Sequence, residues 1–392
     1  MLKIAVVTRY FPSSGEPAQG RSLYETLRIV SRRADVRVFY PNAAYPRIFQ
    51  PRSRTYSQLD PGFRPPEVNV SYFNYPALPL ISRPLNGWMA ARTLLPHVRA
   101  FGPDLVFGCF LYPEGFAALK IARSLDVPAA TMSIGSDLNR IGDRITLRHT
   151  RTVLRQSDGL VTVCEDLRRT AVALGAPAGK SRAILNGCDL RVFHPADRAQ
   201  ARERLGIDPN FEVVVYVGRM DLKKGLRELV QAAAELHHRR PRLHCYLVGS
   251  GPDRPAVEET IRDCEAGSCV HLIPGCAFDE VAAWMTAADV FTLPSYMEGC
   301  PNVVLEALAC GRPVVATRVG GIPEIVSEAC GSLVPPQDSA SLAQSLGAVL
   351  DRPWNATDLS AHNSRSWDAP ASELMQAFES LAGDRATERS AR

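Results

Sequence analysis

Two glutamates eight residues apart, Glu298 and Glu306, frame the segment of this chain with the clearest capacity for chemistry. An apolar run ends at Leu293, a loop follows, and Pro301 predicts the start of a helix, because proline is favoured at the first helical position. The first N–H groups of a helix have no partner within it, and together with the helix dipole they favour a bound phosphate. The residues predicted to surround this phosphate are Cys300, Pro301, Asn302 and Val303.

The two carboxylates must serve a different part of the same ligand, because a carboxylate beside a phosphate repels it. Asn302 and Glu306 are four residues apart and share one helix face, which lets Glu306 reach past the phosphates. Glu298 lies on the loop before the helix. Since carboxylates accept hydrogen bonds from hydroxyl groups, the segment predicts a ligand that carries both phosphates and a polyol.

A second cluster follows the apolar run that ends near Val217. Gly218 permits a tight turn, and Arg219 and Lys224 place two cations where a strand is expected to end. In open α/β sheets ligands bind at the carboxyl ends of strands, and arginine grips a diphosphate bidentately while lysine acts as a point charge. A solvated Lys-Lys-Gly turn explains these residues equally well, so both interpretations stay open here.

The candidate site residues must be positioned by secondary-structure elements. The sequence contains short β-branched runs, each followed by a helical pattern. Ile4–Thr8, Leu105–Cys109 and Val213–Gly218 are examples, and such alternation predicts parallel strands covered by helices on both faces. Two such series predict an α/β fold with two Rossmann-like domains. The stretch Asn42–Pro84, rich in Pro, Arg, Ser and aromatic residues without a clear period, predicts a long loop or irregular insertion.

The junction between the two series is expected near Asn186–Pro195, where an Asn-Gly turn and a Phe-His-Pro sequence interrupt the pattern. The predicted N-terminal domain therefore spans residues 1–190 and the predicted C-terminal domain spans residues 191–365. A helix over residues 366–383 is expected to cross back to the first domain. Residues 384–392 are expected to form a flexible tail.

The net charge of +4 conceals an uneven distribution. Residues 1–190 hold 25 Lys and Arg against 14 Asp and Glu, a net +11, and the rest of the chain carries −7. A strongly basic half favours contact with an anionic surface or partner. The densest basic stretch has four arginines at spacings of four, three and four, which places them on one helical face; they are Arg144, Arg148, Arg151 and Arg155.

Two interpretations of this arginine face stay open. A solvated helix face and a face for an anionic membrane surface or acceptor fit the pattern about equally well. Nucleic acid is disfavoured as a partner, because no aromatic interleaving or nucleic-acid motif accompanies the charge.

Composition excludes several classes of protein. Of the 392 residues 46% are apolar and 22% charged, values that exclude disorder, collagen and coiled coil for the bulk of the chain. The longest apolar stretch, residues 105–122, is interrupted by Pro113, Glu114 and Lys120, so no transmembrane helix is predicted. The first apolar run, Ile4–Val7, stops at Arg9 and is too short for a signal peptide, so none is predicted. The expected location is the cytoplasm, with peripheral attachment to the cytoplasmic membrane face if the arginine face meets lipid.

The ten cysteines include no Cys-x-x-Cys pair and mostly lie in apolar runs, which favours buried thiols over a disulfide framework. Cys264, Cys269 and Cys276, with His271 nearby, are the best candidate metal ligands. Their spacing matches no zinc pattern, so no metal site is predicted.

Together the two segments resemble the retaining GT-B glycosyltransferases of family 4, the glycosyl transferases group 1 type. The resemblance rests on the Glu-x7-Glu pair, on Gly218-Arg219 with Lys224-Gly225, and on Gly320-Gly321-Ile-Pro-Glu. It is specific over the second half of the chain and mainly architectural over the first. The sequence Gly135-Ser-Asp-Leu-Asn is similar to exopolysaccharide and teichuronic-acid type transferases.

The resemblance implies a GT-B fold, in which two parallel sheets face a central cleft, and a retaining, metal-independent hexosyl transfer from a UDP- or GDP-sugar to a hydroxyl of a saccharide acceptor. Arg219 and Lys224 would bind the donor diphosphate, Glu306 the ribose and Glu298 the transferred sugar. Apart from the donor substrate no cofactor is implied. The basic first half favours a polyprenyl-diphosphate-linked acceptor in cell-surface polysaccharide synthesis.

Two positions depart from the family. The first-domain loop that would approach the phosphates runs from Gly15 to Gly20 without paired glycines, and Ile134 stands where many members have a histidine. Asp137 is then the nearest polar candidate for a contact with acceptor or sugar. An N-cap for the following basic helix is the equally weighted alternative for Asp137.

Other functions fit less well. The sequence Gly175–Ser181 has three residues between its glycines instead of the four of a P-loop, and Gly249-Ser-Gly251 lacks the third glycine of a dinucleotide fingerprint. A UDP-sugar epimerase on the same architecture and a non-catalytic nucleotide-sugar-binding subunit are the alternatives. Nucleotide release without an acceptor would separate the epimerase from the transferase, and activity restored by a partner would support the subunit.

Overall fold

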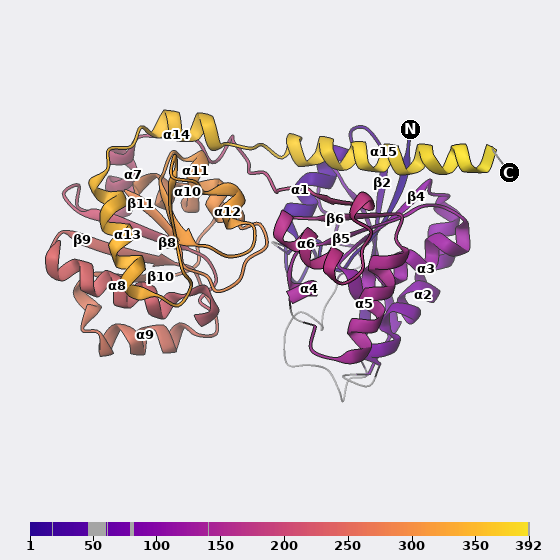
Figure 1. Ribbon diagram of the computed structural model, residues 1–392, viewed down its shortest axis with the longest axis horizontal. Coiled ribbons are helices and arrows are strands. Elements are labelled where there is room, and N and C mark those ends of the chain that lie inside the picture. Colours follow the sequence, from indigo (N-terminus) through magenta and orange to yellow (C-terminus); the bar gives the residue numbers. More distant parts are fainter. Residues whose placement is uncertain (18, 46–59, 61, 79–81, 140, 391–392) are drawn as a thin grey trace. The chain divides into compact units, whose positions relative to one another are not determined.

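Strands and helices alternate along the chain, and the strands form two parallel sheets (Figure 1). The computed structural model describes all residues from 1 to 392 except 18, 46–59, 61, 79–81, 140 and 391–392. The chain divides into unit 1, which comprises residues 1–186 and 367–392, and unit 2, which comprises residues 187–366. The prediction of an α/β fold with two Rossmann-like domains is confirmed.

Unit 1 contains a seven-stranded sheet in the order β3-β2-β1-β4-β5-β6-β7, in which Ile4 of the central strand pairs with Val36 and Leu105. The elements of unit 1 are β1 (Lys3–Val7), α1 (Arg21–Val30), β2 (Asp35–Ala44), β3 (Asn69–Pro76), η3 (Arg83–Leu85), α2 (Asn86–Phe101), β4 (Leu105–Cys109), η4 (Leu111–Gly115), α3 (Phe116–Leu125), β5 (Ala129–Ser133), α4 (Ser136–Asn139), α5 (Arg144–Gln156), β6 (Gly159–Thr162), α6 (Glu165–Ala173), η5 (Ala178–Lys180), β7 (Ser181–Ala183) and α15 (Asp368–Ser390).

The core of unit 1 contains side chains from both the N-terminal and the C-terminal parts of the chain. Side chains of β1, β2 and β4 are buried on one sheet face against α1 and α15, and Phe378 of α15 meets Phe107 of β4 edge to face with ring centroids 5.0 Å apart. Burying a phenyl ring contributes roughly 1.5–3 kcal/mol. This contact helps to hold α15 against unit 1, along which the helix runs in Figure 1.

Unit 2 contains a six-stranded sheet in the order β10-β9-β8-β11-β12-β13. The elements of unit 2 are α7 (Arg198–Leu205), β8 (Glu212–Val217), η6 (Leu222–Lys224), α8 (Leu226–Arg239), β9 (Leu243–Val248), α9 (Arg254–Asp263), η7 (Ala266–Ser268), β10 (Val270–Ile273), α10 (Phe278–Ala287), β11 (Val290–Leu293), α11 (Asn302–Ala309), β12 (Val314–Thr317), α12 (Ile322–Ile325), β13 (Gly331–Val334), α13 (Ser339–Asp351) and α14 (Ala356–Asn363).

Three boundaries differ from the predicted ones. Residues 187–190 belong to unit 2, because Cys188 forms a bridge with Ser366. The last helix runs from Asp368 to Ser390 and so extends past the predicted helix end at residue 383. The predicted insertion over 42–84 contains the strand β3, whose pairing with β2 runs over eight residues; residues 46–59 of that stretch lie outside the described part.

Candidate functional site

The two segments singled out in the second half meet at one point of the unit 2 sheet. β8 and β11 are neighbours, with β9 beyond β8 on one side and β12 beyond β11 on the other. The strand order reverses between them, and in open α/β sheets ligands bind outside the carboxyl ends of the strands at such a switch point. The loops that leave these two strands are residues 218–225 and 294–301.

Two glycines allow the loops around this point to touch. Gly225 has a φ of +71°, and a Cβ there would lie 2.0 Å from the carbonyl oxygen of Pro294. Gly320 has a φ of +53°, and its Cβ would lie 1.9 Å from the carbonyl oxygen of Glu298. The loops after β8, β11 and β12 therefore form one backbone cluster that side chains at these positions would force apart.

Replacing Gly225 with alanine is expected to lower the free energy of unfolding by about 2–3 kcal/mol or more, because the left-handed backbone conformation and the backbone clash add. Gly267→Ala in the same unit is the matched control, since no atom lies within 4 Å of the Cβ it would add. Denaturant unfolding of both variants measures the difference. Equal stability of the two would show that the close approach of the loops is not maintained in solution.

Lys224 and Glu298 form an ion pair inside this cluster. The Nζ of Lys224 lies 2.6 Å from Oε1 of Glu298, and the hydroxyl of Ser295 donates a hydrogen bond to the same oxygen at 2.7 Å. The side chains of Lys224 and Glu298 are 30% and 11% exposed, so the lysine keeps contact with solvent while the carboxylate is mostly enclosed. The carboxylate holds the ammonium group in place, where an arriving anion competes for it.

Helix α11 begins directly after this loop. Pro301 is its N-cap, with a ψ of 112°, so the helix starts one residue later than predicted. Proline has no side-chain acceptor, and the cap therefore supplies no side-chain hydrogen bond to the first turn, which includes Asn302 and Val303. Cys300, just before the cap, is buried. A helix start of this kind fits a phosphate, because its first N–H groups are left without side-chain partners from the cap.

Glu306 lies one turn into α11 and is only 7% exposed. Burial, and then the negative charge of Glu306, raise the pKa of the Cys188 thiol to about 12. The carboxylate of Glu306 is therefore enclosed by the protein, close enough to Cys188 for its charge to act on the thiol.

Arg219 lies on a turn whose backbone is held by a hydrogen bond from a side chain of the preceding strand, β8. The hydroxyl of the buried Tyr216 donates a hydrogen bond to the Arg219 carbonyl at 2.8 Å. Gly218 leaves space for this contact, because a Cβ there would lie 2.6 Å from the Tyr216 hydroxyl. Burial raises the pKa of Tyr216, so the hydroxyl stays a donor. The Arg219 side chain itself is exposed.

Three polar side chains that sequence reasoning missed organise the site. Ser295 binds Glu298, the Tyr296 hydroxyl donates to both carboxylate oxygens of Glu228 at 2.8 and 2.9 Å, and Asp253 accepts from the Leu222 N–H at 2.9 Å. Serine, tyrosine and aspartate are ordinary loop residues, so no spacing marks them. Only the position of Ser295, two residues after the end of a strand, pointed toward the site.

Gly20 in unit 1 is the N-cap of α1 and has a φ of +66°. A Cβ there would lie 2.3 Å from the carbonyl oxygen of Tyr10, so the close passage of the loop itself requires glycine. The local backbone therefore requires glycine at position 20, independently of any ligand.

Asp137 does not cap the basic helix, so that alternative is wrong. The cap of α5 is Asp143, whose carboxylate accepts a hydrogen bond from the Thr146 N–H at 2.7 Å. Asp137 lies in α4 and fastens the loops after β4 and β5. Its carboxylate accepts three hydrogen bonds at 2.8–3.2 Å, from the Leu111 N–H, the Ser133 hydroxyl and the Gly135 N–H.

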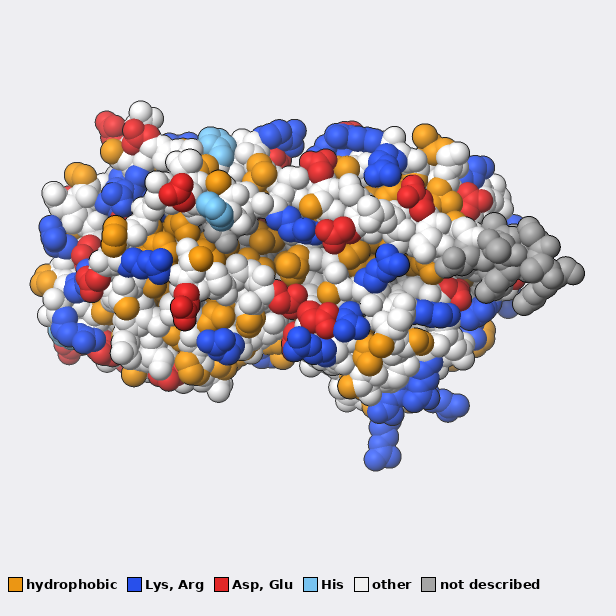
Figure 2. Space-filling model, turned by 45° about the horizontal axis from the view of Figure 1, so that its top comes forward, with side chains coloured by type: hydrophobic (Ala, Val, Ile, Leu, Met, Phe, Trp, Pro, Cys, Tyr) orange, Lys and Arg blue, Asp and Glu red, His pale blue; other side chains and the backbone are white. Residues whose placement is uncertain are grey.

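The arginine face lies on α5 as its spacing predicted, and all four of its members, Arg144, Arg148, Arg151 and Arg155, are exposed. Around α5 the surface also carries apolar groups: Leu85, Trp88 and Ile145 are 56%, 49% and 48% exposed. Figure 2 shows one face of the molecule, on which Lys and Arg side chains lie among Asp and Glu side chains.

No helix within the described ranges combines the length and the apolar character needed to cross a bilayer. Among the same residues no three His, Cys, Asp or Glu side chains gather as metal ligands would.

Two family models match the chain. The model described as Glycosyltransferase Family 4 matches residues 19–192, and the model described as Glycosyl transferases group 1 matches residues 212–352.

Curated relatives are similar over parts of their length. A D-inositol 3-phosphate glycosyltransferase of Kineococcus radiotolerans is 35% identical over 61% of this chain and 61% of its own length. The corresponding enzyme of Frankia alni is 32% identical over 68% and 71%. A putative teichuronic acid biosynthesis glycosyltransferase, TuaC of Bacillus subtilis, is 27% identical over 88% of both chains.

Solved structures share the fold at lower identity. Sucrose-phosphate synthase from Thermosynechococcus elongatus has a TM-score of 0.79 at 22% identity and covers 98% of this chain and 100% of its own. Alr3699/HepE from Anabaena, solved in complex with UDP, has a TM-score of 0.73 at 18% identity, with 97% and 100% covered.

Proposed function

This chain belongs to the glycosyltransferases of family 4, the glycosyl transferases group 1 type, and on that premise we propose that it moves a hexosyl group from a nucleotide-diphosphate sugar to a saccharide hydroxyl with retention of configuration. The observation that carries this proposal is the Lys224–Glu298 pair at the β8/β11 switch point, beside the start of α11. At this point a cation and a helix start, which are both suited to a phosphate, lie close to carboxylates, which are suited to hydroxyl groups.

The proposed donor is UDP-sugar or GDP-sugar. Arg219 and Lys224 bind the diphosphate, the first turn of α11 (Asn302, Val303) adds N–H groups, and Glu306 accepts hydrogen bonds from the ribose hydroxyls. Glu298 binds hydroxyls of the transferred sugar. The UDP complex of the Anabaena relative supports a uridine nucleotide as the first candidate.

The proposed mechanism relies on electrostatic stabilisation by the protein. The bond between the anomeric carbon and the phosphate oxygen breaks with oxocarbenium character, and its electron pair stays on the phosphate. Lys224, Arg219 and the helix start neutralise that growing charge. The acceptor hydroxyl attacks from the face that the phosphate leaves, its proton passes to the phosphate, and the configuration is retained. Cationic side chains perform the role that a divalent metal would otherwise fill.

Thermal unfolding with UDP, GDP, ADP and NAD at saturating concentration tests the proposal. A ligand at about 100 times its dissociation constant adds roughly 2.7 kcal/mol to the stability of the folded state. A shift with one nucleoside diphosphate supports the donor site and identifies the base. A shift with NAD alone, or with none of the four, contradicts it.

We further propose that the acceptor is lipid-linked, as a polyprenyl-diphosphate saccharide is, and that the enzyme meets it at an anionic membrane face. The support is the contiguity of basic and apolar groups in unit 1. Lys120 lies over the Trp88 ring at 4.5 Å, and Trp88 packs on Phe116, whose ring contacts His149 of α5. Exposed aromatic and aliphatic groups among cations suit an interface with anionic lipid.

Reversing two charges on α5, Arg144→Glu with Arg148→Glu, is expected to lower sedimentation with phosphatidylserine vesicles more than ten-fold, because each basic residue near such a surface contributes about 1 kcal/mol. Wild-type binding should fade as salt rises and should be weak on neutral lipid. Arg239→Glu with Arg242→Glu, in unit 2, changes the net charge equally and serves as control. Binding that ignores salt and lipid charge would refute the membrane proposal.

A further inference from the structure

The loop that follows β11 holds a buried hydroxyl group beside the candidate donor site. Ser295 lies two residues after the end of the strand and is completely buried. Its hydroxyl donates a hydrogen bond to Oε1 of Glu298 at 2.7 Å, and the Nζ of Lys224 lies 2.6 Å from the same oxygen. Two donors from two different loops therefore converge on one carboxylate oxygen.

The hydrogen bond between Ser295 and Glu298 is not a helix cap. The spacing Ser-x-x-Glu is that of a capping box, in which each side chain bonds to the backbone N–H of the other residue. Here the bond joins the two side chains, and α11 begins only at Asn302, after both residues. The serine hydroxyl therefore acts on the carboxylate itself and has no part in starting the helix.

The second oxygen of the Glu298 carboxylate is left open. Among the described residues no donor reaches Oε2, and 11% of the side chain is exposed. An ionised carboxylate has about four acceptor sites on its two oxygens. Because both protein donors bind Oε1, the acceptor sites of Oε2 are left for a group from outside the protein.

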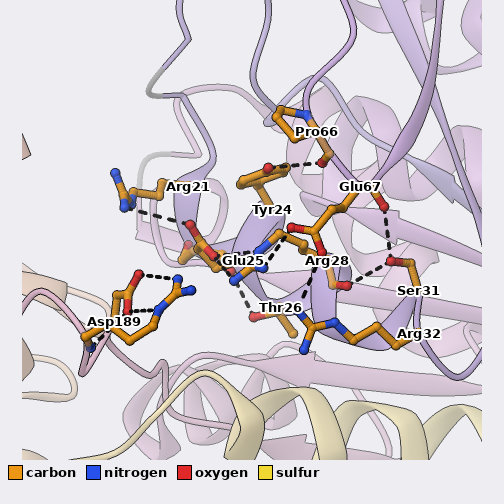
Figure 3. Close-up of polar contacts among 12 residues, drawn as sticks. Arg21, Tyr24, Glu25, Thr26, Arg28, Ser31, Arg32, Pro66, Glu67 and Asp189 are labelled. Atoms are coloured by element: carbon orange, nitrogen blue, oxygen red, sulfur yellow. Dashed lines mark hydrogen bonds and ion pairs between the residues drawn. The ribbon is translucent and has the colours of Figure 1, made fainter.

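Glu25 of unit 1 shows how a carboxylate of similar burial is paired entirely within the protein (Figure 3). Its side chain is 9% exposed, close to the value for Glu298. Arg28 donates a hydrogen bond to Oε2 of Glu25 at 3.1 Å, and Arg21 lies 3.8 Å from Oε1. Both oxygens of Glu25 have a cation beside them, whereas in Glu298 both donors are gathered on one oxygen.

The backbone around Ser295 is held from two sides, which fixes the direction of its hydroxyl. The Tyr296 N–H donates a hydrogen bond to the Lys223 carbonyl at 2.9 Å, and this bond ties the loop to the turn after β8. The hydroxyl of Thr317, the last residue of β12, donates to the Ser295 carbonyl. Binding groups must be held within about 0.5 Å of their productive positions by neighbours that are themselves fixed, and Ser295 meets this condition.

We propose that Ser295 is a positioning residue for the transferred sugar, whose hydroxyl fixes the Glu298 carboxylate so that Oε2 accepts a hydrogen bond from a hydroxyl group of that sugar. An ammonium group has three donors, and the second donor on Oε1 holds the carboxylate in place when Lys224 turns its other N–H groups to the diphosphate. The inference rests on the proposed function, because it concerns the sugar which that reaction transfers.

The test compares nucleotide sugars with the nucleotides that they contain. Calorimetric titration gives the Kd of UDP, UDP-glucose, UDP-galactose, UDP-N-acetylglucosamine, GDP and GDP-mannose. The ratio of the Kd of a nucleotide sugar to that of its nucleotide reports the contribution of the sugar. For the nucleotide sugar that the wild-type chain binds best, Ser295→Ala should raise this ratio about three- to ten-fold, the effect of one lost hydrogen bond. The Kd of the nucleotide itself should change less than about two-fold.

A double-mutant cycle tests whether Ser295 acts through Glu298. In a chain that already carries Glu298→Ala, adding Ser295→Ala should change the ratio less than about two-fold, because the target of the serine is gone. Thr292→Val is the matched control. Thr292 is as completely buried as Ser295, but its hydroxyl has no hydrogen-bond partner among the described residues, so its loss should leave the ratio unchanged.

Ser295→Ala should fold, because alanine occupies no more space than serine and Glu298 keeps its contact with Lys224. Thermal unfolding without ligand verifies this. Equal weakening of nucleotide and nucleotide sugar, an unchanged ratio, or an undiminished effect of Ser295→Ala beside Glu298→Ala overturns this inference alone. A wild-type chain that binds none of the nucleotides or nucleotide sugars overturns the proposed function as well.

Discussion

Alanine in place of Lys224 should reduce turnover by about 10²–10³-fold while the protein remains folded, since removing one preorganised group that stabilises transition-state charge has an effect of this size. In the proposed mechanism negative charge grows on the leaving phosphate, and Lys224 is the cation whose Nζ the structure fixes, 2.6 Å from Oε1 of Glu298. Most of the loss should appear in kcat, because the ammonium group stabilises the transition state, in which negative charge has grown on the phosphate, more than it stabilises the bound donor.

The stability cost of Lys224→Ala should be about 1 kcal/mol or less, because the lysine side chain is 30% exposed and water screens the pair. Glu298 keeps the hydrogen bond from Ser295 after the substitution. Unfolding measurements on the variant therefore separate a damaged fold from a damaged site.

Lys223→Ala is the matched control for this prediction. Lys223 is the adjacent lysine and is exposed, and its loss removes the same charge one position away. If charge in the turn alone were important, both variants would lose activity equally. A Lys224→Ala protein that turns over donor at the wild-type rate would remove Lys224 from the proposed mechanism.

The fold was largely predictable because parallel strands buried on both faces are nearly continuous apolar runs. Val213–Gly218 and Val290–Leu293 are such runs, and the structure contains strands there. β3 was missed because an edge strand needs no continuous apolar run, and Asn74 interrupts its aromatic residues. Its evidence lies in long-range pairing with β2, which a local pattern does not contain.

The candidate site was predictable where function requires a residue type at a fixed spacing, as for Glu298 and Glu306. The contact between Lys224 and Glu298 was not, because it joins residues 74 positions apart through the adjacency of β8 and β11. For Asp137, in contrast, the local sequence suggested a role that the structure does not contain. Its place before a basic helix suggested a cap, yet Asp143 lies closer to the helix start and its side chain reaches the Thr146 N–H. Local sequence cannot decide between two acceptors that compete for one helix start.

The second large effect is expected from Glu306→Ala, which should remove most of the stabilisation by the nucleoside diphosphate that the wild-type chain binds. Glu306 is buried one turn into α11, at the depth where it would accept hydrogen bonds from the ribose. Losing a hydrogen bond to a charged group raises the dissociation constant roughly ten- to a hundred-fold. At a concentration that stabilises the wild-type chain by about 2.7 kcal/mol, the variant should then gain only about 0.4–1.4 kcal/mol.

Pyrophosphate provides the discriminating probe, because it has the phosphates of the donor and no ribose. Stabilisation by pyrophosphate should survive Glu306→Ala and should be lost in Lys224→Ala, whereas the nucleoside diphosphate should lose stabilisation in both variants. Each shift is measured against the same variant without ligand, so a change in intrinsic stability cancels, and Glu259→Ala, at an exposed glutamate of unit 2, should match the wild-type chain with both ligands. If Glu306→Ala lost the pyrophosphate effect as well, Glu306 would be supporting the helix start rather than binding ribose, and the division of the site into a phosphate part and a hydroxyl part would be wrong.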